Sequence, residues 1–202
     1  MIKRISLLFS IFFLFYCSIG HARESVIHCS RELTGILEKI QTLPEGNELI
    51  AKVLERGSIS IEINYDYSEQ FDGYWSSTDR TIYITKKENS SQCFLITALL
   101  FELHNALRTA DLEEMYSQAT NQEVKREEFI ECVEYIEYEN ALSTSMLLAQ
   151  GAAYDIFPCD CGWKLSDNFP EHLHIQRQGG HSASIGRIYD DLTTASSLEN
   201  QS

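Results

Sequence analysis

The chain has 202 residues, and its 16 basic and 30 acidic side chains give it a formal net charge of −14. Affinity for nucleic acid and for anionic membrane surfaces comes mainly from Lys and Arg, so a chain this acidic is expected to bind neither. Its length is enough for one domain with a sizeable core.

Residues 1–22 have the pattern of a secretory signal peptide. Two basic residues precede an apolar run at 5–16, and a small-residue cleavage site follows, ending at Ala22. The run is too short to cross a bilayer comfortably, and no later stretch reaches the roughly 18 apolar residues of a membrane helix. We therefore predict export, to the periplasm or out of the cell, with no integral membrane segment after cleavage. Lipid attachment at Cys17 is a less favoured alternative, because the bulky Tyr16 precedes it.

Five cysteines follow the predicted leader: Cys29, Cys93, Cys132, Cys159 and Cys161. In an exported protein they are expected to form structural disulfides rather than catalytic thiols. Because five is odd, at least one is free or pairs between chains. Cys159 and Cys161 are separated by one residue, so each is expected to pair elsewhere, and the connectivity stays open.

The first half of the remaining chain predicts two helices and two strands. Apolar residues at helical spacing cover 30–56, with a turn at 44–47. Alternation of apolar and polar residues predicts a strand at 58–67, and a second strand is predicted at 80–86 after a loop at 72–77. Both strands are expected to belong to one small sheet.

The second half predicts long helices. A helix at 92–108 follows the N-capping segment 89–91. A polar connection at 111–121 then leads to a long helix at 123–150, which Gly151 is expected to end or kink.

Beyond Pro158 the periodicity fades, which predicts an irregular region and then a polar, disordered tail at 179–202. The expected organisation is a signal peptide at 1–22, one domain at 23–178 and this tail. The predicted fold class is α+β: a helix-rich single domain with a small antiparallel sheet.

The segment Phe101-Glu102-Leu103-His104-Asn105 is similar to the H-E-x-x-H motif of zinc peptidases. With the strand before it, the segment resembles the zincin metallopeptidases over residues 57–140. The resemblance implies a zincin-like scaffold, in which histidines at i and i+4 bind zinc and the Glu beside the first activates water. Phe101 and Asn105 occupy the two ligand positions here, so the motif is degenerate.

Helix geometry decides which side chains accompany Glu102. Asn105 is three residues away, or about 60° around the helix, so these two side chains share a face. His104 is two residues away, or about 200°, and leaves on the nearly opposite face, where we expect it on the surface or partly packed beside Thr97 and Arg108. Glu102 is the candidate catalytic residue, and Asn105 and His104 are candidate binding residues.

Two interpretations of Glu102 stay open. Its helix is apolar almost all round, so an ionised carboxylate there is costly unless it is paired or hydrogen-bonded. The favoured interpretation is structural, with bonds to Asn105, to a tyrosine such as Tyr135 or Tyr138, or to backbone amides of the adjoining strand. The other makes Glu102 a general base or a ligand-binding acceptor in a cleft.

Two further groups have the residue types of a site. One, on the long helix, could face Glu102 and contains Glu131, Glu134 and Glu137. The other lies in the C-terminal region and contains Cys159, Cys161, His172, His174 and His181. A run of acids usually marks a solvated helix face, and the Cys/His spacing is not a standard zinc pattern. Metal binding at either group is the less favoured interpretation.

The favoured function is that of an exported protein on a zincin-like scaffold that has lost zinc-peptidase activity. It would act by binding a protein or small-molecule partner, and it needs no cofactor. The alternative is a hydrolase or metallopeptidase that uses Glu102 with metal ligands recruited from elsewhere, in which case zinc is the expected cofactor. A chance likeness to the zincins is the third interpretation.

Overall fold

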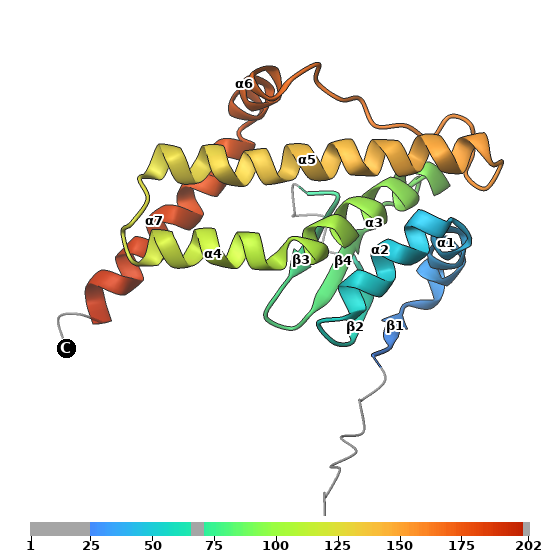
Figure 1. The fold of residues 1–202 in the computed structure, drawn as a ribbon, viewed down its shortest axis with the longest axis horizontal. Coiled ribbons are helices and arrows are strands. Elements are labelled where there is room, and N and C mark those ends of the chain that lie inside the picture. The colour runs from blue at the N-terminus through green and yellow to red at the C-terminus, as the bar shows by residue number, and fades with distance from the viewer. Residues whose placement is uncertain (1–24, 66–70, 200–202) are drawn as a thin grey trace, which may run out of the picture.

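The computed structural model describes residues 25–65 and 71–199, so the predicted leader lies outside the described residues. These residues form a helix-rich α+β fold with a small four-stranded sheet (Figure 1). In chain order the elements are β1 (Ile27–Cys29), α1 (Arg31–Thr42), α2 (Pro44–Leu54), β2 (Ile59–Asn64), β3 (Gly73–Ser76), β4 (Thr81–Thr85), α3 (Gln92–Leu107), α4 (Thr109–Thr120), α5 (Arg126–Ala153), α6 (Phe169–Gly179) and α7 (His181–Glu199). Within the described ranges, no helix combines the length and the apolar content needed to cross a bilayer.

The sheet is mixed rather than antiparallel, which corrects the expectation from sequence. The strand order is β1-β2-β4-β3, and β2 runs parallel to both β1 and β4. Only the edge strand β3 is antiparallel to its neighbour, β4. The chain passes from β2 to the far edge and returns through the β3–β4 hairpin, so β4 lies beside β2 in the same direction. Strand β3 lies in the segment 72–77, where the sequence predicts a loop, because the four residues of β3 include a glycine and do not alternate.

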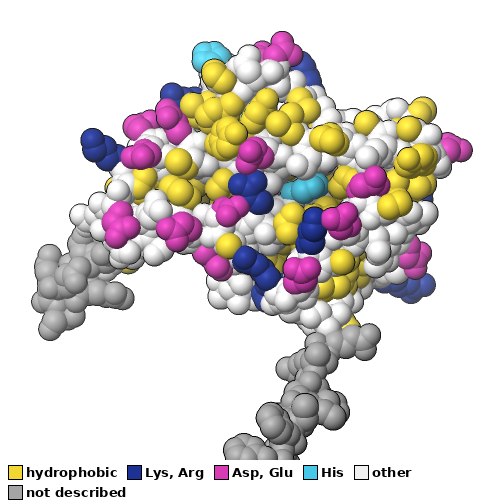
Figure 2. Space-filling model, viewed as in Figure 1, with side chains coloured by type: hydrophobic (Ala, Val, Ile, Leu, Met, Phe, Trp, Pro, Cys, Tyr) yellow, Lys and Arg dark blue, Asp and Glu magenta, His cyan; other side chains and the backbone are white. Residues whose placement is uncertain are grey.

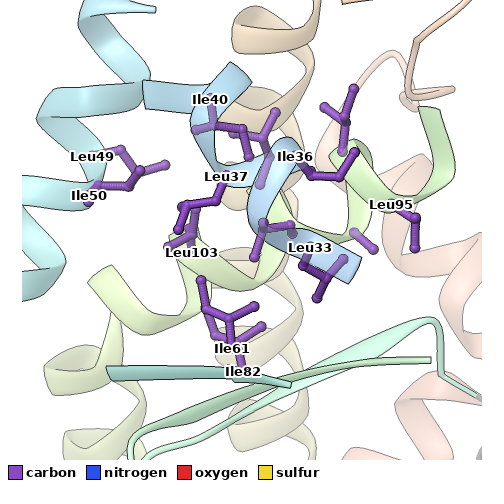
Figure 3. Close-up of a cluster of buried hydrophobic side chains, with 14 of the residues drawn as sticks. Leu33, Ile36, Leu37, Ile40, Leu49, Ile50, Ile61, Ile82, Leu95 and Leu103 are labelled. Carbon is purple, nitrogen blue, oxygen red and sulfur yellow. The ribbon is translucent and has the colours of Figure 1, made fainter. Parts of the chain in front are cut away.

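Helix α3 is the central element of the main core. It lies between the sheet and α5, with α1 and α2 beside it (Figure 1). Its almost continuous apolar sequence explains this position, because a helix that is apolar all round must be covered all round. Figure 3 shows its Leu95 and Leu103 among side chains of α1 and above Ile61 and Ile82 of the sheet. The hydroxyl oxygen of Ser91 accepts a hydrogen bond from the backbone N–H of Phe94 (3.1 Å), which caps α3 as expected.

A second buried cluster joins α4, α5 and α7. Ile185 of α7 is 4% exposed and packs in this cluster with Phe129 and Val133 of α5. The hydroxyl of Tyr189 also donates to the carbonyl oxygen of Val124 (3.0 Å). Residues 181–199 are therefore helix α7 rather than a disordered tail, and residues 109–120 are helix α4 rather than an irregular connection. In both helices the inward-facing apolar residues are separated by so many polar ones that the helical pattern is faint.

Helix α5 does not end at Gly151 but continues to Ala153. The ring of Phe157 lies directly against Gly151, and a Cβ atom added at this glycine would overlap it. Gly151 therefore lets the segment after α5 pack closely onto the helix, and it does not end the helix.

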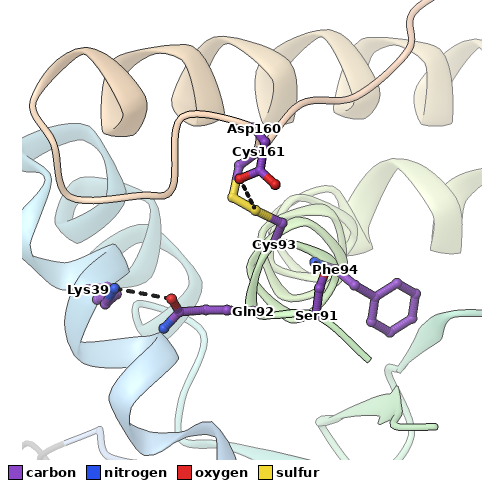
Figure 4. Close-up of a disulfide and its surroundings, with 7 residues drawn as sticks. All are labelled: Lys39, Ser91, Gln92, Cys93, Phe94, Asp160 and Cys161. Atoms are coloured by element: carbon purple, nitrogen blue, oxygen red, sulfur yellow. Dashed lines mark hydrogen bonds between the residues drawn. A yellow bond between two sulfur atoms is a disulfide. The ribbon is translucent and has the colours of Figure 1, made fainter. Parts of the chain in front are cut away.

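A disulfide joins Cys93, at the start of α3, to Cys161 in the segment after α5 (Figure 4). It confirms the expectation of a disulfide and shows that Cys159 and Cys161 do not pair with each other. Among the described residues, Cys29, Cys132 and Cys159 are free. The bond connects positions 68 residues apart in sequence, so it restrains the C-terminal segment against the central helix.

Candidate functional site

Glu102 lies in the middle of α3 and is only 4% exposed. The side-chain amide of Asn105 donates a hydrogen bond to its carboxyl oxygen Oε2 (2.9 Å). The amide of Asn140 in α5 donates in turn to Oδ1 of Asn105 (2.8 Å). The backbone of Trp75 in β3 also hydrogen-bonds the carboxyl of Glu102. The i,i+3 pair expected from helix geometry is therefore present, and neither Tyr135 nor Tyr138 is among these partners.

His104 lies on the other side of α3, as helix geometry predicts, but it is buried rather than at the surface. Its Nδ1 lies 2.8 Å from the carbonyl oxygen of Leu100 and 3.1 Å from the hydroxyl of Thr144 in α5. Burial lowers the pKa of its imidazole, which favours the neutral form. His104 therefore packs between α3 and α5 and does not share a cavity with Glu102.

Two adjoining cavities, of about 370 and 240 Å³, open beside Glu102. Both are bordered by the same six residues: Phe71, Gly73, Phe101, Glu102, Glu137 and His181. Phe94 and Trp163 add apolar walls to the larger cavity, and Tyr74 and Trp75 add them to the smaller one. The arrangement combines apolar walls with a few converging polar groups, as small-ligand sites do.

Gly73 of β3 allows the edge strand to lie close to Glu102. A Cβ atom at this position would lie 2.8 Å from the carbonyl oxygen of Tyr83 and 3.3 Å from Cγ of Glu102. A larger residue would therefore push β3 away from α3 and change the shape of both cavities.

The two carboxyls that border both cavities, Glu102 and Glu137, have raised pKa values. Burial raises the pKa of Glu102 to about 8; the hydrogen bonds from Asn105 and Trp75 oppose this effect and the charge of Glu137 adds to it. Burial likewise raises the pKa of Glu137 to about 7, although its side chain is still 23% exposed, so water in the cavity weakens this effect. Glu102 is consequently mostly protonated at neutral pH and can donate as well as accept a hydrogen bond.

Glu134 lies one turn before Glu137 on α5, and its side chain is fully buried. Its Oε1 accepts a hydrogen bond from the hydroxyl of Ser182 (2.5 Å) and lies 3.2 Å from Nδ1 of His181. Its Oε2 lies 3.5 Å from Nε2 of His172. Burial alone would raise the pKa of Glu134, but interactions with these three side chains outweigh it and lower the pKa to about 2.

Helix α6 carries His172 to this position by packing on α5. Figure 2 shows hydrophobic side chains gathered over α6 and the adjoining part of α5. Between these helices, the ring of Phe169 contacts the rings of Tyr135 and Tyr138, and Tyr138 also contacts the ring of His172. These contacts orient the imidazole of His172 toward α5.

Glu134 and Glu137 were expected to lie with other acids on a solvated helix face, and this expectation is wrong for both. The signal that could have identified them is their spacing from buried apolar positions of the same helix. Glu134 comes four residues after Ile130, and Glu137 comes four residues after Val133, so each carboxyl follows an inward-facing residue by about one helical turn.

The residues at the zincin ligand positions do not fit zinc. The ring of Phe101 packs against the ring of Trp163, with centroids 4.8 Å apart, and it has no lone pair to donate. The amide of Asn105 is already engaged with Glu102 and Asn140. Helix α3 does pack along β4, as the resemblance implies, but the edge strand beside Glu102 is β3.

The Cys/His group of the C-terminal region is only partly assembled. Cys161 is bonded to Cys93, Cys159 is exposed, and His174 lies at the surface beside Gln178. Only His172 and His181 come together, and both do so at Glu134.

Comparison of the chain with known protein families, with curated proteins and with solved structures finds no match.

Proposed function

We propose that this chain is an exported protein on a zincin-like scaffold without a peptidase zinc site, and that it acts by binding a ligand in the two cavities at Glu102. The observation that carries the proposal is the buried Glu102–Asn105–Asn140 chain of hydrogen bonds, which opens on apolar walls shared by both cavities. The leader pattern at 1–22 and the Cys93–Cys161 disulfide support export, because disulfides persist in oxidising compartments.

The cavity chemistry favours a small ligand with an apolar face and a hydrogen-bond donor or a positive charge. Aromatic rings such as Phe94, Phe101 and Trp163 attract apolar groups and cations to their faces. Glu102 and Glu137 supply acceptors, and the net charge of −14 disfavours anionic ligands.

Intrinsic fluorescence offers a direct test. The chain has two tryptophans, Trp75 and Trp163, and each borders one of these cavities. We expect aromatic amines and short peptides with Lys or Arg to shift the fluorescence in a saturable way, in buffer with EDTA, whereas matched carboxylates do not. A cationic group beside Glu102 would lower the pKa of this carboxyl and favour its ionised form, which glutamine cannot adopt. Glu102→Gln should therefore weaken this binding at least tenfold, while the exposed Glu38→Gln on α1 should leave it unchanged. Equal binding of anionic analogues, or an unaffected Glu102→Gln protein, would count against the proposal.

A second candidate is a hydrolase that uses Glu102, and one observation favours it. Glu102 and Glu137 border the same cavities, and both have pKa values near the neutral range, where general acids and bases work best. Such an enzyme should lose turnover in both Glu102→Gln and Glu137→Gln while still binding substrate. Turnover that survives either substitution in a well-folded protein would exclude this role.

A further inference from the structure

Two histidines and two glutamates from three helices meet at the inner edge of the cavities. Glu134 and Glu137 come from α5, His172 from α6 and His181 from α7. The two histidines are far from the two glutamates in sequence, and the packing of α6 and α7 against α5 brings them together. We refer to these four residues as the His/Glu cluster.

The His/Glu cluster brings together three possible ligands of one metal ion, Glu134, Glu137 and His181, with His172 beside Glu134. Glu134 Oε2 lies 3.5 Å from Nε2 of His172, and Glu134 Oε1 lies 3.2 Å from Nδ1 of His181. The other ring nitrogen of His181, Nε2, lies 3.5 Å from Oε2 of Glu137, and one ion can bind only one of these two nitrogens. Two ligands bound about 2.1 Å from a tetrahedral ion are about 3.4 Å apart. Ligand atoms of Glu134, Glu137 and His181 also lie within 4.8 Å of one another.

Two buried atoms of the cluster lack a hydrogen-bond partner. These are Oε2 of Glu134, on a side chain that is fully buried, and Nε2 of His172, on a side chain that is 12% exposed. They face each other at 3.5 Å, which is longer than an ordinary N–H···O hydrogen bond. A buried polar atom without a partner is costly, and a bound cation would satisfy both atoms at once.

The competing explanation is a network of ion pairs between imidazolium and carboxylate groups. That network accounts for Oε1 of Glu134, which interacts with Ser182 and His181. The same network pairs Oε2 of Glu134 with Nε2 of His172, but at 3.5 Å, so neither atom has a well-formed hydrogen bond. The nearby Arg177 of α6 pairs with Glu127 and Glu131 instead. Arg177 therefore does not neutralise the two carboxylates of the His/Glu cluster.

We propose that Glu134, Glu137 and His181 bind one divalent transition-metal ion, with His172, which lies beside Glu134, as a further ligand. Imidazole and carboxylate donors together suit Zn²⁺ and similar ions better than Ca²⁺ or Mg²⁺, which prefer oxygen ligands alone. Glu137 and His181 are 23% and 25% exposed and border both cavities, so the ion would be accessible from there. This site is distinct from the degenerate motif on α3, because it uses neither Phe101 nor Asn105.

Metal titration of the untagged protein, without residues 1–22, tests this proposal. We expect the metal-free protein to bind one equivalent of Zn²⁺, with a Kd at or below about 1 µM by calorimetry. The Co²⁺-bound protein should give an absorption spectrum typical of nitrogen and oxygen ligands, without a thiolate charge-transfer band. Mg²⁺ and Ca²⁺ at the same concentration should not compete.

Matched substitutions locate the site. His181→Ala and Glu134→Gln should each weaken Zn²⁺ binding at least tenfold. The exposed His174→Ala on α6 and Glu131→Gln on α5 should bind as the unmodified protein does. Circular dichroism and thermal melting check that each variant is folded.

Three outcomes would overturn the proposal: no Zn²⁺ binding by the folded protein, a thiolate band that assigns the ion to the free cysteines, or full binding by His181→Ala. The Co²⁺ spectrum needs no variant, so the proposal can fail even if a substitution prevents folding. Because the ligand-binding assay at Glu102 is run with EDTA, its result is independent of this one.

Discussion

Replacing Glu102 with glutamine should stabilise the metal-free protein at neutral pH. The pKa of this carboxyl is 4.5 in the unfolded chain and about 8 in the fold, so the fold favours its protonated form. The stability contributed by that form is complete below pH 4.5 and is lost as the pH rises toward 8. Glutamine is neutral at every pH and still offers an oxygen to the amide of Asn105.

The magnitude follows from the difference between the two pKa values. Each pH unit above 4.5 and up to 8 weakens the fold by about 1.4 kcal/mol through this group. At pH 7 the penalty is about 3 kcal/mol, a large share of the 5–15 kcal/mol typical of a domain.

Urea unfolding of both proteins between pH 4.5 and 8, with EDTA present, measures this effect. We expect the midpoints to coincide at the acidic end and to diverge as the pH rises, with Glu102→Gln the more stable. Glu38→Gln, on the exposed face of α1, is the control and should follow the unmodified protein at every pH. Parallel curves for Glu102→Gln and the unmodified protein would refute the argument that burial destabilises the ionised carboxyl.

Three further predictions concern the scaffold. Cys93→Ser should lower the free energy of unfolding by about 4 kcal/mol, because the lost disulfide closes a 68-residue loop; no change in the urea midpoint would contradict this. Gly151→Ala should lower the free energy of unfolding by about 1–3 kcal/mol, because the added methyl group overlaps the ring of Phe157. Gly35→Ala on α1, where a Cβ atom meets no neighbour, should raise it by up to about 1 kcal/mol. The two melting temperatures must therefore shift in opposite directions. The pKa of Glu134 is lowered to about 2, so the stability that its ionised form contributes is complete above pH 4.5 and is lost as the pH falls toward 2. In buffer with EDTA, Glu134→Gln should flatten the dependence of stability on pH in this range. An unchanged curve would contradict the stabilising role of the ionised Glu134.

The elements with strong local signals could be predicted from the sequence. The apolar continuity of α3, its cap at Ser91 and the alternation in β2 depend on neighbours along the chain, so their patterns are clear. The Glu102–Asn105 contact was predictable for the same reason, since helix geometry alone sets it.

The remaining parts of the site depend on packing between distant segments. His181 reaches Glu134 only because α7 folds back on α5, and no local pattern indicates this. The direction of β4 relative to β2 likewise depends on the β3 hairpin rather than on the composition of either strand. Sequence patterns therefore identified Glu102 and named Glu137 among the acids that could face it, but they did not bring His181 to Glu134.

The Cys93–Cys161 disulfide also determines how the larger cavity is enclosed. Cys93 itself borders this cavity, and Asp160, Gly162 and Trp163, the neighbours of Cys161, form part of the wall opposite α3. That wall belongs to a stretch without regular secondary structure, and the covalent bond adds to the Phe101–Trp163 ring contact that holds it against α3. Formation of the Cys93–Cys161 bond thus fixes this side of the larger cavity.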